Sequence, residues 1–364
     1  MSTLNKISTI EAIALVIIPS INRLILFLPQ NILVQNGSSS ILNVLYISII
    51  AIIFTYIICR LFKNFSGLDI IDISEFLGGK VLRTIIGIFI CVYIMIMSAI
   101  LVREFCEVLH ILYYQNASVI YLLLSFFVVT IVANMVNGNS LIRTNFIFCF
   151  GMVASLILCF GLVIPNMTYQ RFFPILGNGI NTIFISGLMH LFSLNGLMVL
   201  YLIPPMLKNT ENKNFKKIAL ISVIITTLLL ISATVCLLLS FSFVTELKNI
   251  SPVYLLISNN PFGKYFQHPE SLFMFVWILS FMTYLNIAVM FELRILKKLS
   301  GVKNSKPFIF PLCMITFILA LLPPTLIFTR EINIISSKYI AGPFVFVIFP
   351  IILLLANLKK RRFS

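Results

Sequence analysis

Long apolar stretches follow one another along almost the whole chain, and polar residues gather in the short segments between them. A transmembrane helix needs about 20 mainly apolar residues, and none of the stretches shows the alternation of a membrane β-strand. The pattern therefore predicts an all-α integral membrane protein with ten transmembrane helices. The predicted spans are Ile10–Asn31, Ile41–Phe62, Val81–Phe105, Val119–Val136, Phe146–Pro165, Ile180–Ile203, Ile218–Val244, Leu272–Phe291, Phe308–Phe328 and Ser336–Leu358.

The composition agrees with this class and excludes a soluble fold. Of the 364 residues, 60% are hydrophobic and only 10% are charged, whereas soluble domains carry about 25% charged residues. No polar linker divides the chain. We therefore expect one membrane domain, residues 1–364, with a first repeat over about 6–165, a second over about 172–358 and a basic tail at 359–364.

The positive charges indicate how the chain lies in the membrane. If the amino terminus is cytoplasmic, most of the 26 lysines and arginines fall in segments on the cytoplasmic side. The positive-inside rule then predicts that both termini are cytoplasmic, which an even number of spans requires. The basic tail Lys359–Arg362 would face the anionic surface of the lipid bilayer. The orientation in the membrane thus explains the net charge of +15, and the sequence predicts no nucleic-acid partner.

Residues for metal binding or catalysis do not form recognisable groups. The seven cysteines lie in or beside the apolar stretches without a C-x-x-C pair, and the three histidines are scattered. No phosphate-binding glycine loop and no nucleophile–base–acid set occurs. The sequence predicts no cofactor, no metal and no enzymatic activity, and no run of acidic residues or histidines within the spans predicts a proton relay.

Two spans contain polar residues near their centres. Arg23 lies in the first span beside Pro19, and a charge at this depth costs at least about 2.5–3.5 kcal/mol. The sixth span is interrupted at Phe192–Gly196. In transporters built as inverted repeats, the first helix of each half is broken and the substrate binds between the breaks. The sequence therefore favours a five-plus-five inverted repeat with broken helices 1 and 6, although glycines and prolines that serve only packing would give the same pattern.

The candidate ligand-binding residues follow from these breaks. Freed backbone groups and polar side chains there could hold a small solute. Arg23 would pair with an anionic group of the ligand, or else with freed carbonyls of its own helix. Four residues of the third and eighth spans could contribute contacts or only packing. The candidates are Ser20, Asn22, Arg23, Tyr93, Met97, Ser193, Leu194, Asn195, Gly196, Thr283 and Tyr284.

Two further segments have local signals. Apolar residues recur at helical spacing over 68–77, which predicts a short surface helix ended by Gly78 and Gly79. Arg103, Glu104 and Glu107 cluster at the end of the third span, where Arg103 and Glu107 are spaced for an i,i+4 ion pair. We interpret this cluster as a structural pair or subunit contact rather than an ion gate.

Several segments, in this order and over nearly the whole chain, resemble those of one known family, the spore germination permeases, which are B subunits of GerA-type germinant receptors. They are Lys6–Glu11 followed by Leu26–Pro29, Val102–Glu107, Gly138–Arg143, Phe173–Ile180 and Tyr201–Pro205.

This resemblance implies a fold related to the amino acid–polyamine–organocation (APC, LeuT-like) transporters. It also implies a place in the spore inner membrane beside a receptor A subunit and a lipoprotein C subunit. The expected role is to bind a small nutrient, usually an amino acid, and to trigger germination. The alternatives are an ion-coupled secondary amino acid transporter and a scaffold whose binding site is vestigial.

Overall fold

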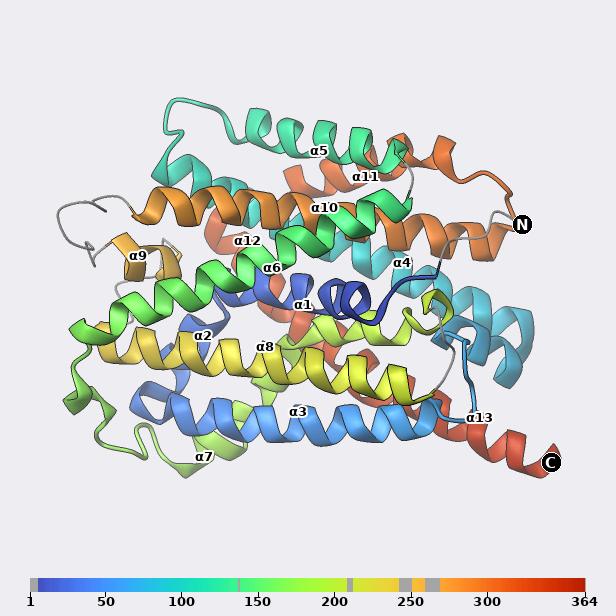
Figure 1. The fold of residues 1–364 in the computed structure, drawn as a ribbon, viewed down its shortest axis with the longest axis horizontal. Helices are drawn as coiled ribbons and strands as arrows, with labels where there is room; N and C mark the ends of the chain where they lie inside the picture. The colour runs from blue at the N-terminus through green and yellow to red at the C-terminus, as the bar shows by residue number, and fades with distance from the viewer. Residues whose placement is uncertain (1–5, 137, 208–211, 242–250, 259–268, 364) are drawn as a thin grey trace.

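The computed structural model describes residues 6–136, 138–207, 212–241, 251–258 and 269–363, and nearly all of them are helical. Within these ranges there is no strand, only an isolated bridge between Ile7 and Leu207. The α-helices form an elongated bundle (Figure 1). They are α1 Thr9–Leu26, α2 Leu28–Asn36, α3 Ser40–Phe62, α4 Ile70–Leu112, α5 Val119–Met135, α6 Gly138–Val163, α7 Ile180–Phe184, α8 Asn212–Ser240, α9 Pro252–Ser258, α10 Pro269–Ser300, α11 Ile309–Leu321, α12 Leu326–Ile335 and α13 Phe349–Phe363.

Seven helical segments are long and apolar enough to cross a membrane by length and composition. Three shorter apolar segments, Val119–Met135, Ile180–Ser193 and Lys306–Leu321, fall where the sequence predicts the fourth, sixth and ninth spans. The all-helical class is therefore confirmed. The start of α1 and the end of α13 lie at the same end of the bundle, which we call the terminal end (Figure 1).

Helix α1 occupies the centre of the bundle. In its most apolar window 78% of the residues are buried, compared with 33–61% in the other six spans. It packs against α6, α8 and α10 and against the 3-10 helix Asn195–Tyr201. Polar residues on α1 consequently face protein and not lipid, as their cost in hydrocarbon requires.

The break in the first span is not where the sequence placed it. α1 continues as a helix through Pro19 to Leu26, and the chain leaves helical geometry at Phe27 (φ −147°, ψ −6°). The polar residues after Pro19 lie within the helix, where Asn22 Nδ2 donates to the Ile18 carbonyl at 3.1 Å. Pro29 lies in the first turn of the next helix, α2, where its missing N–H would have no partner in any case.

The break in the sixth span lies inside the predicted segment. After the short helix α7, the chain forms two 3-10 helices, Ser186–Ser193 and Asn195–Tyr201, and Leu194 between them is not helical (ψ 35°). The 3-10 geometry leaves more backbone groups at irregular positions than an α-helix would. This span therefore places unwound backbone beside α1.

Two other boundaries differ from the prediction. α6 begins at Gly138, whereas the predicted fifth span begins at Phe146. The segment between the ninth and tenth predicted spans contains α12, which continues through two π-helical segments, Ser336–Ala341 and Phe344–Ile348, into α13. The last span thus begins at Leu326 instead of Ser336.

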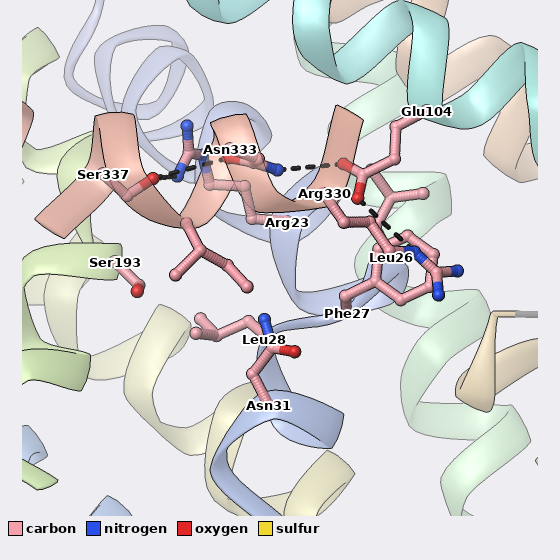
Figure 2. A pocket seen from close by; sticks show the side chains of 11 residues that line it. Arg23, Leu26, Phe27, Leu28, Asn31, Glu104, Ser193, Arg330, Asn333 and Ser337 are labelled. Carbon is pink, nitrogen blue, oxygen red and sulfur yellow. Dashed lines mark hydrogen bonds and ion pairs between the residues drawn. The ribbon is translucent and has the colours of Figure 1, made fainter. Parts of the chain in front are cut away.

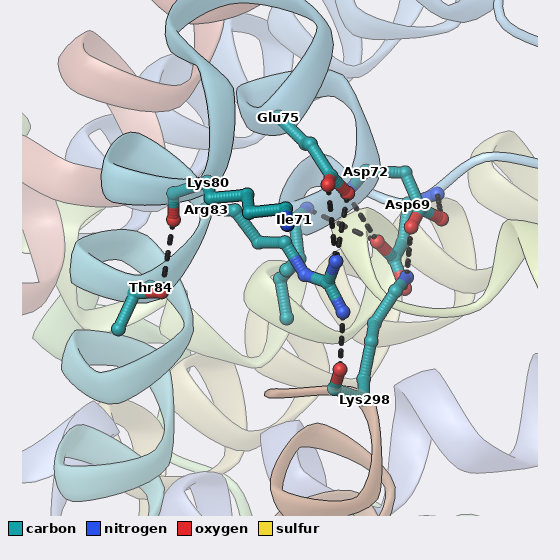
Figure 3. A network of polar contacts seen from close by, with 8 residues as sticks. All are labelled: Asp69, Ile71, Asp72, Glu75, Lys80, Arg83, Thr84 and Lys298. Carbon is teal, nitrogen blue, oxygen red and sulfur yellow. Dashed lines mark hydrogen bonds and ion pairs between the residues drawn. The ribbon is translucent and has the colours of Figure 1, made fainter. Parts of the chain in front are cut away.

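The predicted surface helix forms the first two turns of α4. Asp69 caps it by accepting hydrogen bonds from the backbone N–H groups of Ile71 and Asp72, and Gly78 and Gly79 interrupt it with non-helical angles. Lys298 Nζ, near the end of α10, lies 2.6 Å from a carboxylate oxygen of both Asp69 and Asp72 (Figure 3). This contact fixes the surface helix to the terminal end of α10.

We expect Lys298→Met to lower the free energy of unfolding by about 2 kcal/mol, because two partly buried carboxylates lose their counter-charge. Thermal unfolding of the purified protein in detergent measures the change. Lys303→Met is the matched control, since Lys303 is exposed. Equal midpoints for the two variants would contradict a stabilising role for this contact.

Candidate functional site

A small cavity lies where α1, α4, the 3-10 helix Asn195–Tyr201 and α10 meet. It has a volume of about 60 Å³, and we call it the central cavity. Pro19, Arg23, Tyr93, Ile94, Met97, Gly196, Met198, Val199, Leu202, Tyr284, Ile287, Ala288 and Phe291 line it. Five of the predicted site residues, Arg23, Tyr93, Met97, Gly196 and Tyr284, are therefore brought together from four different spans.

Gly196 allows the unwound sixth span to lie directly on α1. A Cβ atom on Gly196 would be 2.2 Å from Ser20 Oγ and 3.2 Å from the Ser20 backbone nitrogen. Real Cβ atoms do not approach so closely, so only glycine fits beside Ser20 at this crossing. Ser20, another predicted residue, forms the crossing itself and is not among the residues lining the cavity.

Arg23 links the central cavity to a polar network in the last span. Its Nη1 donates to Ser337 Oγ at 2.7 Å, Ser337 Oγ is 3.4 Å from Asn333 Oδ1, and Asn333 Nδ2 donates to Glu104 Oε2 at 2.9 Å. Arg330 Nε ends the series, 3.8 Å from Glu104 Oε1 (Figure 2). The described hydrogen bond of the Arg23 guanidinium thus goes to another span, which argues against its pairing with its own helix.

This network surrounds a second cavity of about 40 Å³, which we call the arginine cavity. Its lining includes the predicted Arg23 and Ser193. Its charged residues are Arg23, Arg330 and Glu104, so the lining is positive overall. A cavity with two guanidinium groups and one carboxylate favours a ligand that carries an anionic group.

A larger cavity of about 490 Å³, the vestibule, adjoins the arginine cavity on the side of α2 and α12. Phe27, Asn31, Ser193, Arg330 and Ile334 line both. The guanidinium carbon of Arg330 is 3.3 Å from the ring centre of Phe27, the residue at which α1 breaks. Arg330, held by Phe27 and Glu104, therefore separates the wide vestibule from the narrow cavities.

The charged residues Arg103, Glu104 and Glu107 on α4 make two separate sets of contacts. Arg103 and Glu107 form the predicted i,i+4 ion pair, with an Nη2–Oε1 distance of 2.6 Å and side chains only 10% and 13% exposed. Glu104 points the other way into the arginine cavity and is 1% exposed. It contacts Asn333 and Arg330 instead of Arg103, because successive helical positions face different directions. A subunit contact of this cluster stays a prediction.

The remaining predicted residues lie beside the cavities. Asn22 faces α10, where Ser280 Oγ donates to its Oδ1 at 2.6 Å, and Thr283 donates to the Ser280 carbonyl at 2.7 Å. Leu194 is buried at the break of the sixth span. The side chain of Asn195 lies outside what the structure describes.

The sequence analysis missed the contribution of α12. Arg330, Asn333 and Ser337 are spaced i, i+3 and i+7, which places them on one helical face. This spacing is visible in the sequence, but Arg330 and Asn333 fall between the predicted ninth and tenth spans and Ser337 falls inside the tenth, so the three were not considered together.

Comparisons with known proteins agree with this architecture. The profile of a family described as spore germination protein matches residues 6–329. No curated protein sequence matches the chain. The crystal structure of a mutant Eremococcus coleocola manganese transporter superposes with a TM-score of 0.61 at 12% identity, over 96% of this chain and 76% of that chain. This likeness shows the fold, which is that of the LeuT-like transporters.

Proposed function

The chain belongs to the spore germination protein family, and on that premise we propose that it is the ligand-binding membrane subunit of a spore nutrient germinant receptor. The chain is a multi-pass integral membrane protein with a transporter fold. In the proposed role it binds a small nutrient, an amino acid, and this binding triggers germination.

One observation supports the proposal above the others, namely the buried cavity at the contact between α1 and the unwound sixth span. Broken helices at the centre of a membrane protein offer backbone groups and polar side chains to a solute. Since a water molecule occupies about 10–15 Å³ by a comparable measure, the 60 Å³ central cavity holds a few waters. A nutrient would enter from the vestibule and enlarge the central cavity as it binds.

Membership of the spore germination protein family also supports the proposed partners and location. We place the protein in the spore inner membrane with a receptor A subunit and a lipoprotein C subunit. The basic residues near the ends of α10 and α13 favour an orientation in which the terminal end faces the spore core. The whole chain would form one membrane domain, with repeats over about 6–165 and 172–358.

Binding and uptake measurements distinguish the proposal from an ion-coupled secondary transporter. We expect purified protein in lipid vesicles to bind radiolabelled amino acids in a saturable way without accumulating them inside. Accumulation above the external concentration would favour the transporter instead. A screen in which no amino acid binds would contradict both.

Arg23→Gln tests the proposed contact with the ligand. We expect the affinity for an amino acid that binds the wild-type protein to fall at least about tenfold, because a charge-assisted hydrogen bond contributes about 1.5–3 kcal/mol. Equilibrium binding to protein in vesicles measures the affinity. Arg60→Gln, on the exposed end of α3, is the control, and equal affinities of the two variants would assign Arg23 a structural role only.

A further inference from the structure

Glu292 is a buried carboxyl group that the proposed function does not use. It lies in α10, its residue exposure is 0%, and neither of its carboxylate oxygens has a hydrogen-bond partner among the described residues. The other buried or partly buried acids behave differently. Glu104 contacts Asn333 and Arg330, Glu107 contacts Arg103, and Asp69 contacts Lys298. Glu292 therefore needs an explanation of its own.

The surroundings of Glu292 contain no described counter-charge. α10 packs against α1, α4, α5, α6, α9 and α11. The titratable groups within electrostatic range of Glu292 are Cys91 of α4, Cys313 of α11 and Tyr284 of its own helix. Arg294, two positions along α10, lies on a different face and is within electrostatic range of Asp69. In the described part of the chain, nothing positive faces the Glu292 carboxyl group.

A carboxylate in this position would be strongly unfavourable, because charge in a low-dielectric interior must be paired or neutralised. A metal ion would need several further ligands, and the described residues contain no group of three histidines, cysteines or acids that could hold one. A proton needs only the carboxyl group itself. We propose that Glu292 is a proton-binding site of the membrane domain, occupied by a proton in the conformation described here.

The position of Glu292 along α10 gives the proton a route of exchange. On one side of it, Tyr284, Ile287, Ala288 and Phe291 line the central cavity. On another face of α10, Met290, Leu293, Arg294 and Lys297 line a cavity of about 250 Å³, which we call the terminal cavity because it also contains the start of α6. Glu292 thus lies on α10 between the residues that line the central cavity and those that line the terminal cavity.

A rotation of α10 that carries Glu292 toward the terminal cavity would release the proton. The O–H bond breaks, its electron pair stays on the carboxylate oxygen, and the proton passes to water. Arg294 and Lys297 in the terminal cavity would then stabilise the carboxylate. Since Phe291 lies in the wall of the central cavity, a solute that enlarges this cavity would also move the neighbouring Glu292.

Infrared spectroscopy of the full-length protein in lipid nanodiscs tests whether Glu292 is protonated. We expect the wild-type protein at neutral pH to show a carboxylic acid C=O band that is lost in Glu292→Gln. Glu107→Gln is the matched control and should keep the band, because Glu107 is paired with Arg103 at 2.6 Å. An unchanged spectrum for Glu292→Gln, or a band that emerges only after sodium is removed, would overturn the proposal.

A second measurement needs no variant and therefore does not depend on folding of the mutant protein. Dicyclohexylcarbodiimide is an apolar reagent that reacts with protonated carboxyl groups inside membranes. We expect mass spectrometry of labelled wild-type protein to place the adduct on Glu292, with less adduct as the pH is raised. An adduct confined to other acids would reject the proposed site, whether or not the chain binds an amino acid.

Discussion

Gly196→Ala is expected to abolish the germination response while the protein is still made. The added methyl group would lie 2.2 Å from Ser20 Oγ, so α1 and the unwound sixth span must separate where they form the wall of the central cavity. Overpacking of this kind costs about 1–3 kcal/mol. Spores with the variant as their only receptor should fail to lose optical density with nutrient, and the purified variant should unfold at a lower temperature.

Two controls make this result specific. In the double variant Ser20→Ala/Gly196→Ala the closest remaining atoms are the Ser20 backbone nitrogen at 3.2 Å and its Cβ at 3.3 Å, so we expect partial recovery. Gly151→Ala in α6 has no heavy atom within 4 Å of the new Cβ. It should be neutral, or stabilising by up to about 1 kcal/mol through helix propensity. A Gly196→Ala variant that germinates and unfolds like Gly151→Ala would refute the close contact, and with it an active binding site at this crossing.

The sequence predicts the helices well, because length and hydrophobicity determine what can cross a bilayer. It also predicts the helix–glycine boundary at Gly78, the Arg103–Glu107 pair and the break beside Leu194. These features depend on residues close together in the chain. Capping, i,i+4 spacing and glycine geometry are local, so one sequence is enough to locate them.

The predictions that were wrong concern helix ends and breaks, which depend on packing against distant parts of the chain. Pro19 was taken as a break, but α1, which is enclosed by other spans, stays helical through Pro19 as far as Leu26. The eighth span was predicted to end at Phe291. The helix in fact continues to Ser300. This continuation buries Glu292, an acidic residue that the predicted end at Phe291 left just outside the span.

Glu104→Gln should be the most destabilising single charge change in the described part of the arginine cavity. It removes the one carboxylate that faces Arg330 and lies within electrostatic range of Arg23. Removing one partner of a buried ion pair costs about 3–5 kcal/mol. We expect about 3 kcal/mol, because the Arg330–Glu104 distance is long at 3.8 Å and Arg330 also borders the vestibule. Unfolding in mixed detergent micelles with increasing sodium dodecyl sulfate measures the change.

A double-mutant cycle with Arg330→Gln shows whether the two side chains act as a pair. If they do, the variant Glu104→Gln/Arg330→Gln should be more stable than the sum of the single changes predicts, by about 1–2 kcal/mol. Glu75→Gln is the control, because the Glu75–Arg83 pair is more exposed, with side chains 36% and 24% exposed, and exposed pairs contribute about 0.2–1 kcal/mol. Strictly additive changes at Glu104 and Arg330 would mean that Arg330 is held by its contact with Phe27. The separation of the vestibule from the arginine cavity would then depend on the break in α1 and not on charge.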